Sequence, residues 1–244
     1  MKNIVLFVVF ILGVVFVQFT QGQTVDDVIN KYLDARGGKD KLNAIKSIYM
    51  EGARQMMGNE IPVKITIVAG KLFRTDFEFS GVGYYTITTP TEGWSFTPMR
   101  GTTAEPIPAD RLKGMQGQMD IAGALADYAK KGSKVELLPK ETVNGTECYK
   151  IKLTQSDAKE VTYFIDMKTN LLLESKQVAK VMNREGKQMD REVITDFSDY
   201  KAVDGVLFPH TIANPGTGQG GGSTTFDKIE LNKEVDAAMY KPAK

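Results

Sequence analysis

The strongest constraint in this sequence is a strict alternation of apolar and polar residues through its first half. Residues 61–68 alternate in this way, and residues 72–79 repeat the pattern after an Ala69-Gly70 turn. Because successive side chains of a strand point to opposite faces, this period of two predicts antiparallel strands with one face toward water. The apolar face must be covered by other elements. In the second segment that face is formed by Phe73, Phe77 and Phe79.

The second half predicts further antiparallel strands with polar turns between them. Residues 161–165 are β-branched and aromatic, residues 166–170 form a turn, and residues 171–176 return. A second turn around Gly186 leads to a strand over residues 191–197, which continues toward Ile212. Further strands are predicted at residues 46–56, 84–89, 93–97, 135–138, 147–153 and 224–231.

Two helices are predicted before the first strand. Thr24 is a residue type that favours the N-cap position, and Asp26 and Asp27 follow in the first turn, where the helix dipole favours anions. Apolar residues recur at helical spacing until Gly37-Gly38, and a short helix follows over residues 39–44. This pair is suited to cover the apolar face of the sheet.

A third helix is predicted over residues 109–131, from an apolar stripe that includes Met115 and Met119. Gly114 and Gly117 weaken such a helix by about 1 kcal/mol each relative to alanine. We therefore interpret this segment as a movable lid. Residues 215–223 are rich in glycine and are expected to form a mobile loop.

The first 22 residues have the pattern of a cleaved signal peptide, with Lys2 before an apolar run over residues 4–17. An uncleaved anchor is the alternative, but the run is shorter than the roughly 20 residues of a membrane span. Cys148 is the one cysteine, far from the cleavage region, so neither a lipid anchor nor an intrachain disulfide is expected. We predict a single domain over residues 23–244, exported to the periplasm and soluble.

Composition and motifs argue against several functions. The net charge of +1 excludes a basic nucleic-acid footprint. His210 is the one histidine, and nothing near Cys148 indicates a lowered thiol pKa. Asp196, Asp199 and Asp204 are interpreted as turn residues, and the glycine-rich segment lacks the lysine of a phosphate loop. We predict that the protein is not an enzyme and has no cofactor or metal, leaving a hydrolase that uses surface carboxylates as a minor alternative.

Apolar surface is the remaining candidate for function. Phenylalanine, tryptophan and flexible methionine side chains suit a cavity that accepts variable apolar ligands, although the same residues could also form an ordinary filled core. The predicted ligand-binding residues are Phe73, Phe77, Phe79, Trp94, Phe96, Met99, Met115 and Met119.

Three short segments carry a resemblance to a known family. They are Tyr-Phe-Ile-Asp with a Lys-Thr-Asn turn (163–170), Asp-Phe-Ser-Asp-Tyr (196–200) and Gly-Val-Leu-Phe-Pro (205–209). In order and spacing they resemble the LolA/LolB-like periplasmic lipoprotein-carrier superfamily, including the outer membrane lipoprotein-sorting proteins of Bacteroidetes-type genomes. The resemblance covers essentially the whole chain after residue 22.

The resemblance implies an α+β fold in which a curved antiparallel sheet forms an incomplete, half-open β-barrel covered by a few helices. It implies a monomeric carrier of lipoprotein acyl chains or other lipids, working between inner- and outer-membrane donor and acceptor proteins. The alternative is a non-catalytic structural or interaction module of the envelope. One departure concerns the arginine that helps to lock the lid in LolA: Ala69-Gly70 occupies the matching place here.

Overall fold

The computed structural model describes residues 23–56, 58–182, 187–215 and 222–242. The predicted signal peptide, the turn at residues 183–186 and residues 216–221 of the glycine-rich loop lie outside the described residues. Within the described part of the chain, no helix is long and apolar enough to cross a membrane.

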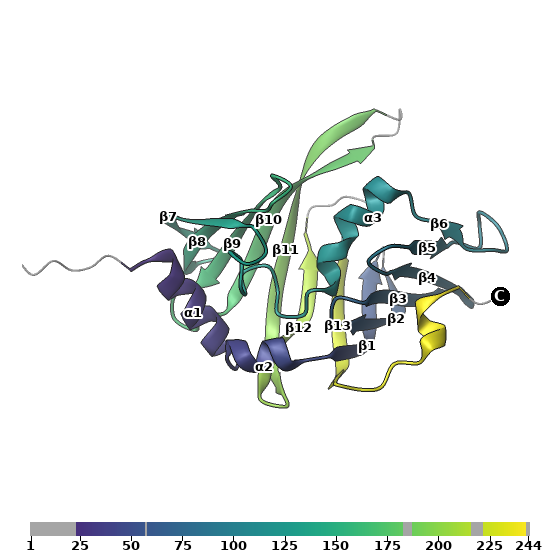
Figure 1. The fold of residues 1–244 in the computed structure, drawn as a ribbon, viewed down its shortest axis with the longest axis horizontal. Helices are drawn as coiled ribbons and strands as arrows, with labels where there is room; N and C mark the ends of the chain where they lie inside the picture. The colour runs from purple at the N-terminus through teal and green to yellow at the C-terminus, as the bar shows by residue number, and fades with distance from the viewer. Residues whose placement is uncertain (1–22, 57, 183–186, 216–221, 243–244) are drawn as a thin grey trace, which may run out of the picture.

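A single antiparallel sheet dominates the described part of the structure (Figure 1). Its thirteen strands run in the order β6-β5-β4-β3-β2-β1-β13-β12-β11-β10-β9-β8-β7. In chain order the strands are β1 (Ser47–Met56), β2 (Asn59–Val68), β3 (Leu72–Phe79), β4 (Val82–Thr88), β5 (Gly93–Phe96), β6 (Glu105–Pro106), β7 (Lys134–Val143), β8 (Thr146–Thr154), β9 (Glu160–Asp166), β10 (Leu172–Met182), β11 (Gln188–Val203), β12 (Val206–Asn214) and β13 (Gly222–Leu231).

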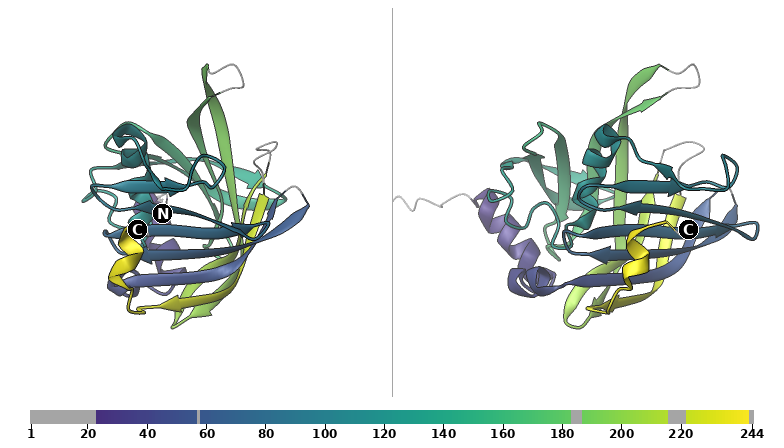
Figure 2. Two further views of the ribbon diagram at one scale, coloured as in Figure 1. Left: turned by 90° about the vertical axis from the view of Figure 1, so that its right-hand side faces the viewer. Right: turned by 45° about the vertical axis from the view of Figure 1, so that its right-hand side comes forward.

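The sheet curves around one face, which we call the inner face, without closing on itself (Figure 2). Register shifts in β1, β7 and β10 accompany this curvature, as expected because a bulge bends a strand and increases its local twist. The two edge strands are β6 and β7, and they follow one another in the chain. We call the opening between these two sheet edges the seam. Residues 107–133, which we call the bridge, span it.

Most predicted strands are confirmed, and β3 has the predicted bounds. Residues 134–143 and 188–203 form longer strands than the sequence indicated, and the two-residue β6 was not predicted. The observed α+β architecture, a curved open sheet with few helices, is the predicted fold class.

The N-terminal helices form where the sequence places them. In α1 (Val25–Ala35) the Thr24 hydroxyl accepts a hydrogen bond from the Asp27 amide, and the Asp27 carboxylate accepts one from the Thr24 amide. This capping box satisfies donors that an open helix end would leave unpaired. α2 (Lys39–Ala44) follows directly. The buried side of α1 packs into the main core through Val28, Ile29, Tyr32 and Leu33.

The predicted helix over residues 109–131 is wrong in length. α3 (Ala109–Met115) ends after two turns and continues as the short 3-10 helix η1 (Gln116–Met119). Residues 120–133 then form a sequence of turns, in which Gly123 and Asp127 have φ values of +88° and +50°. An α-helix cannot pass through left-handed residues, so the apolar spacing continues without helical structure.

The main core lies between the inner face, α1, α2 and the 120–133 segment. Ile151, Leu153 and Ile165 are fully buried under α1, whereas Leu125 and Ala126 bring the 120–133 segment into the same cluster. On the opposite, outer face, the C-terminal 3-10 helix η3 (Ala237–Tyr240) packs against β3 and β4.

Candidate functional site

The inner face carries a row of apolar side chains that the core covers incompletely. Phe73 lies opposite Ile67, and Phe77 lies opposite Val63 on the neighbouring strand. Phe77 also stacks on Tyr84 of β4, with ring centroids 4.8 Å apart and planes 6° from parallel. Complete burial would make this row ordinary core, but part of it remains accessible. The half-buried inner-face residues that pack against the core include Met50, Ile65, Phe73, Phe77, Tyr163, Phe197 and Ile212.

The structure places Trp94 and Phe96 on the outer face, so the prediction that they share a face with Phe73 is wrong. Trp94 pairs with Ile87, which pairs with Arg74, and cross-strand partners point to the same side of a sheet. Arg74 in turn alternates with Phe73 along β3. The ring of Phe96 instead stacks on Tyr85, with centroids 5.2 Å apart.

The remaining predicted residues lie at the periphery or in the bridge. Phe79 continues the inner side of β3 but is 41% exposed at the hairpin end, and Met99 is 89% exposed in the loop after β5. Met115, at the end of α3, is half-buried. Met119 is buried in η1, and its carbonyl accepts a hydrogen bond of 3.1 Å from the Gly70 amide. The bridge is thus attached to the β2–β3 turn.

Two hollows flank the bridge on opposite sides of η1. The smaller one, about 340 Å³, lies against α2 and the β2–β3 turn and is lined by Leu42, Ile45 and Met119 among others. The larger one, about 500 Å³, separates η1 from the inner side of β9 and β10. Gln116 and Asp120 line both hollows. Each side of the bridge therefore borders a hollow over part of its length. The two hollows leave space for the bridge to shift.

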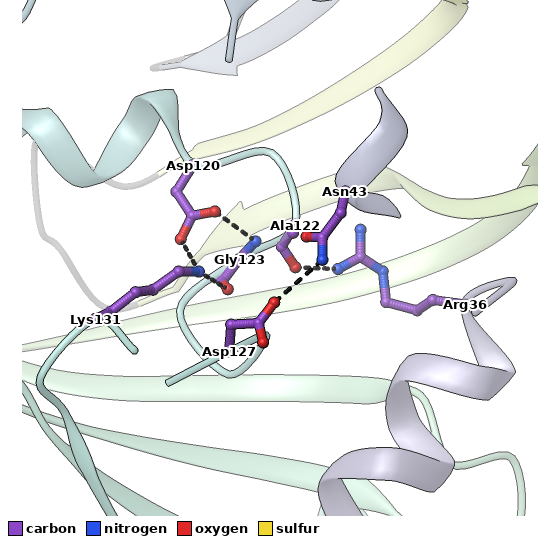
Figure 3. A network of polar contacts seen from close by, with 7 residues as sticks. All are labelled: Arg36, Asn43, Asp120, Ala122, Gly123, Asp127 and Lys131. Carbon is purple, nitrogen blue, oxygen red and sulfur yellow. Dashed lines mark hydrogen bonds and ion pairs between the residues drawn. The ribbon is translucent and has the colours of Figure 1, made fainter. Parts of the chain in front are cut away.

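Arg36, at the end of α1, contacts the bridge at Ala122 (Figure 3). Its guanidinium donates to the Ala122 carbonyl and to the Tyr32 hydroxyl, each at 3.2 Å, although Arg36 is only 8% exposed. The same group lies over the rings of Tyr32 and Phe208, at 5.7 and 5.9 Å from their centroids. No pattern in the sequence marks this arginine, which the sequence analysis missed.

Charged contacts fix the rest of the bridge (Figure 3). The Asp120 carboxylate accepts from the Gly123 amide at 3.2 Å and from Lys131 Nζ at 2.6 Å. Asp127 forms an ion pair with Lys39 of α2 at 2.7 Å, and Asn43 of the same helix donates to it at 3.1 Å. The segment that was interpreted as a lid is therefore mainly a loop held by polar contacts rather than a long helix.

These contacts make the attachment of the bridge sensitive to pH. Lys39, followed by Lys130 and Asn43, lowers the pKa of Asp127 well below its ordinary value of 3.8. A carboxyl group with a lowered folded-state pKa stabilises the fold above pH 3.8, and this contribution declines as the pH falls below that value. Acid should therefore release the bridge from α2.

We expect Asp127→Asn to lower the melting temperature at neutral pH, by an amount that shrinks progressively as the pH falls below 3.8. Asparagine tolerates the left-handed backbone of this position, so the substitution removes charge without adding strain. Melting temperatures of both proteins between pH 7 and pH 3 measure the effect. Asp40→Asn on α2 is the control, since Asp40 forms no ion pair within the described residues. A difference that stays constant with pH would contradict the assignment.

The groups considered for catalysis do not meet. Cys148 is buried on the outer side of β8, where burial and then Asp166 raise the pKa of its thiol. His210 is buried on the inner side of β12, and its Nδ1 lies 2.8 Å from the Phe226 carbonyl oxygen. Asp204 has a left-handed backbone in the β11–β12 turn, as predicted. The prediction is wrong for the other two aspartates, because Asp196 is paired within β11 and Asp199 has its left-handed backbone inside the same strand. Within the described residues no three potential ligands cluster to hold a metal ion.

The fold can now be compared with known structures. A LolA superfamily protein from Nitrosomonas europaea aligns over 89% of this chain and 98% of its own, with a TM-score of 0.55 and 14% identity. The chain has a LolA-like fold. A DUF1329 family protein from Desulfovibrio piger matches this fold over 89% and 97% of the two chains, with a TM-score of 0.57 and 13% identity.

A third structure with this LolA-like fold is a domain described as an outer membrane lipoprotein-sorting protein, from Vibrio parahaemolyticus. It aligns over 88% of this chain and 94% of its own, with a TM-score of 0.53 and 12% identity. No protein-family model matches the sequence, and no curated protein matches it. The likeness is therefore one of fold, and the function must be argued from the residues.

Proposed function

We propose that this chain is a non-catalytic carrier that binds acyl chains of lipoproteins or other lipids against the inner face. The observation that carries the proposal is the row of half-buried apolar side chains around Phe73 and Phe77 beneath a bridge with hollows on both sides. The LolA-like fold, shared with a lipoprotein-sorting domain, supports it. An acyl chain would complete the burial that the bridge leaves unfinished.

Apolar burial supplies the binding energy in this proposal. Each methylene group removed from water contributes about 0.8 kcal/mol, so burial of about ten methylene groups supplies the roughly 8 kcal/mol that corresponds to micromolar affinity. The bridge must shift for a chain to enter, and its polar attachments to α1 and α2 are weaker obstacles than a packed helix. In the cell we propose a monomer that travels through the periplasm between donor and acceptor proteins of the two membranes.

Replacing Phe77 by alanine should weaken binding of a fluorescent fatty acid about tenfold, because its ring forms part of the inner wall. Phe96→Ala is the matched control: it removes the same side chain from the outer face two strands away. Titration of the fluorescent ligand into each variant measures affinity, and chemical denaturation measures stability.

The same pair of variants tests the alternative, an envelope module with a filled core. If Phe77 belonged to a solid core, its loss would cost about 3–5 kcal/mol of unfolding free energy with no ligand to lose. A large loss of stability without a change in lipid binding would exclude the inner face as the site. Equal loss of binding in both variants would also argue against it.

A further inference from the structure

The larger hollow beside the bridge has a chemical character that the rest of the inner face lacks. Its far wall is the inner side of β9 and β10, where Tyr163 and Val161 lie opposite Ser175 and Gln177. Its near wall is α3 and η1, with Lys113 and Gly117, and the β8–β9 turn adds Gln155. The half-buried Tyr163 also packs against the apolar core, so the hollow adjoins the apolar inner face.

Most charged side chains that line this hollow already form an ion pair with a neighbouring side chain. Lys131 pairs with Asp120 at 2.6 Å, and Asp157 pairs with Lys159 at 2.7 Å. Within the described residues, Lys113 is the one charged lining group without an ion pair, and it is exposed. An ion pair between a ligand phosphate and this exposed lysine would contribute at most about 1 kcal/mol of binding free energy. The hollow therefore offers little to attract a phosphate.

Neutral hydrogen-bonding groups are available instead. The side chains of Gln155, Ser175 and Gln177 face the hollow and have no hydrogen-bond partner among the described residues. A glutamine amide offers two donors and an acceptor, and a serine hydroxyl offers both functions. A volume of about 500 Å³ falls in the range of small-molecule sites.

We propose that this hollow binds the headgroup of the acyl ligand and selects a neutral one, rich in hydroxyl or amide groups, over a phosphate. The inference rests on the proposed carrier function, because the hydrocarbon must occupy the inner face for the headgroup to lie here. A phosphate would lose its hydration and gain one exposed cation, whereas hydroxyl or amide groups would pair with the unused glutamine and serine side chains.

The test compares ligands with identical acyl chains and different headgroups. A neutral glycosyl diacylglycerol, a diacylated lipopeptide with an uncharged peptide, and phosphatidylglycerol each displace a fluorescent fatty acid from the full-length mature protein. We expect at least one neutral ligand to bind about tenfold more tightly than phosphatidylglycerol, equivalent to one or two good hydrogen bonds. The two neutral ligands distinguish a sugar from a peptide as the source of the polar groups.

Two substitutions connect that preference to the hollow. Gln177→Leu should reduce the neutral preference severalfold, and Gln177→Lys should shift it toward phosphatidylglycerol, because the new ammonium group would face the headgroup. Gln55→Leu on β1, outside the hollow, should leave the preference unchanged. Equal binding of all three headgroups, or tighter binding of the phosphate, would overturn the inference while leaving the carrier intact. Displacement by none of the lipids would overturn both.

Discussion

Replacing Gly37 by alanine should destabilise the protein by about 3 kcal/mol or more. Gly37 has a φ of +116°, and a Cβ atom there would overlap the carbonyl oxygen of Gly205 and lie 3.1 Å from Val206 Cα. These are backbone atoms of the β11–β12 turn, held by the hydrogen bond of 2.8 Å from the Leu207 amide to the Arg36 carbonyl. Neither partner can yield without separating α1 from the sheet.

Gly38 provides a matched control for that prediction. Its φ is +98°, close to that of Gly37, but a Cβ atom there would meet nothing within 4 Å. Gly38→Ala should therefore cost the backbone strain alone, about 1–2 kcal/mol. Urea denaturation of both variants separates the two contributions. Equal losses would show that α1 does not approach the β11–β12 turn as closely as described.

Arg36→Ala should be the second severe change, with a loss of about 2–4 kcal/mol. The substitution leaves a cavity between the rings of Tyr32 and Phe208 and removes the donor of the buried Ala122 carbonyl. Because Ala122 belongs to the bridge, limited proteolysis should also begin within residues 120–133. Denaturation measures the first effect, and mass spectrometry of the fragments locates the second.

Arg36→Met separates packing from hydrogen bonding in the same place. Methionine fills much of the volume but cannot donate, so it should recover part of the stability and little of the resistance to proteolysis. A variant as resistant as wild type would show that the bridge depends on Asp127 and Asp120 rather than on Arg36. Faster exchange of a bound fluorescent acyl ligand in both Arg36 variants would identify the bridge as the entrance.

The strands could be predicted from the sequence because their periodicity is local, but the face of each strand could not. Phe73 and Phe77 were assigned to one side of β3 correctly, and Trp94 and Phe96 were correctly in phase with one another. Whether the two pairs share a face depends on the length of the turn at residues 89–92. A turn longer or shorter by one residue would exchange the faces of the next strand. Gly93 points inward here, under Leu112 and Ile107.

The bridge was mispredicted for a different physical reason. Its apolar residues keep helical spacing, but Leu125 and Ala126 reach the core from turns that distant contacts stabilise. Asp127 is held by Lys39, more than eighty residues earlier, and Ala122 by Arg36. Such contacts leave no local pattern, so neither the contacts that hold the bridge nor the polar hollow beside it could be predicted. The shared inner side of Phe73 and Phe77 was predicted because both belong to β3, whose bounds and inner side the alternation defines.

The seam between β6 and β7 gives the molecule a mechanical property that a closed ring of strands lacks. The radius of a closed ring is set by the number and stagger of its strands, and widening it breaks ladder hydrogen bonds. A sheet with two free margins can change its coil and let the margins separate while each ladder from β6 to β7 remains paired. In the carrier role that we propose, acyl ligands of different width would be held by bending of the sheet, and residues 107–133, which connect the two margins, would limit how far it opens.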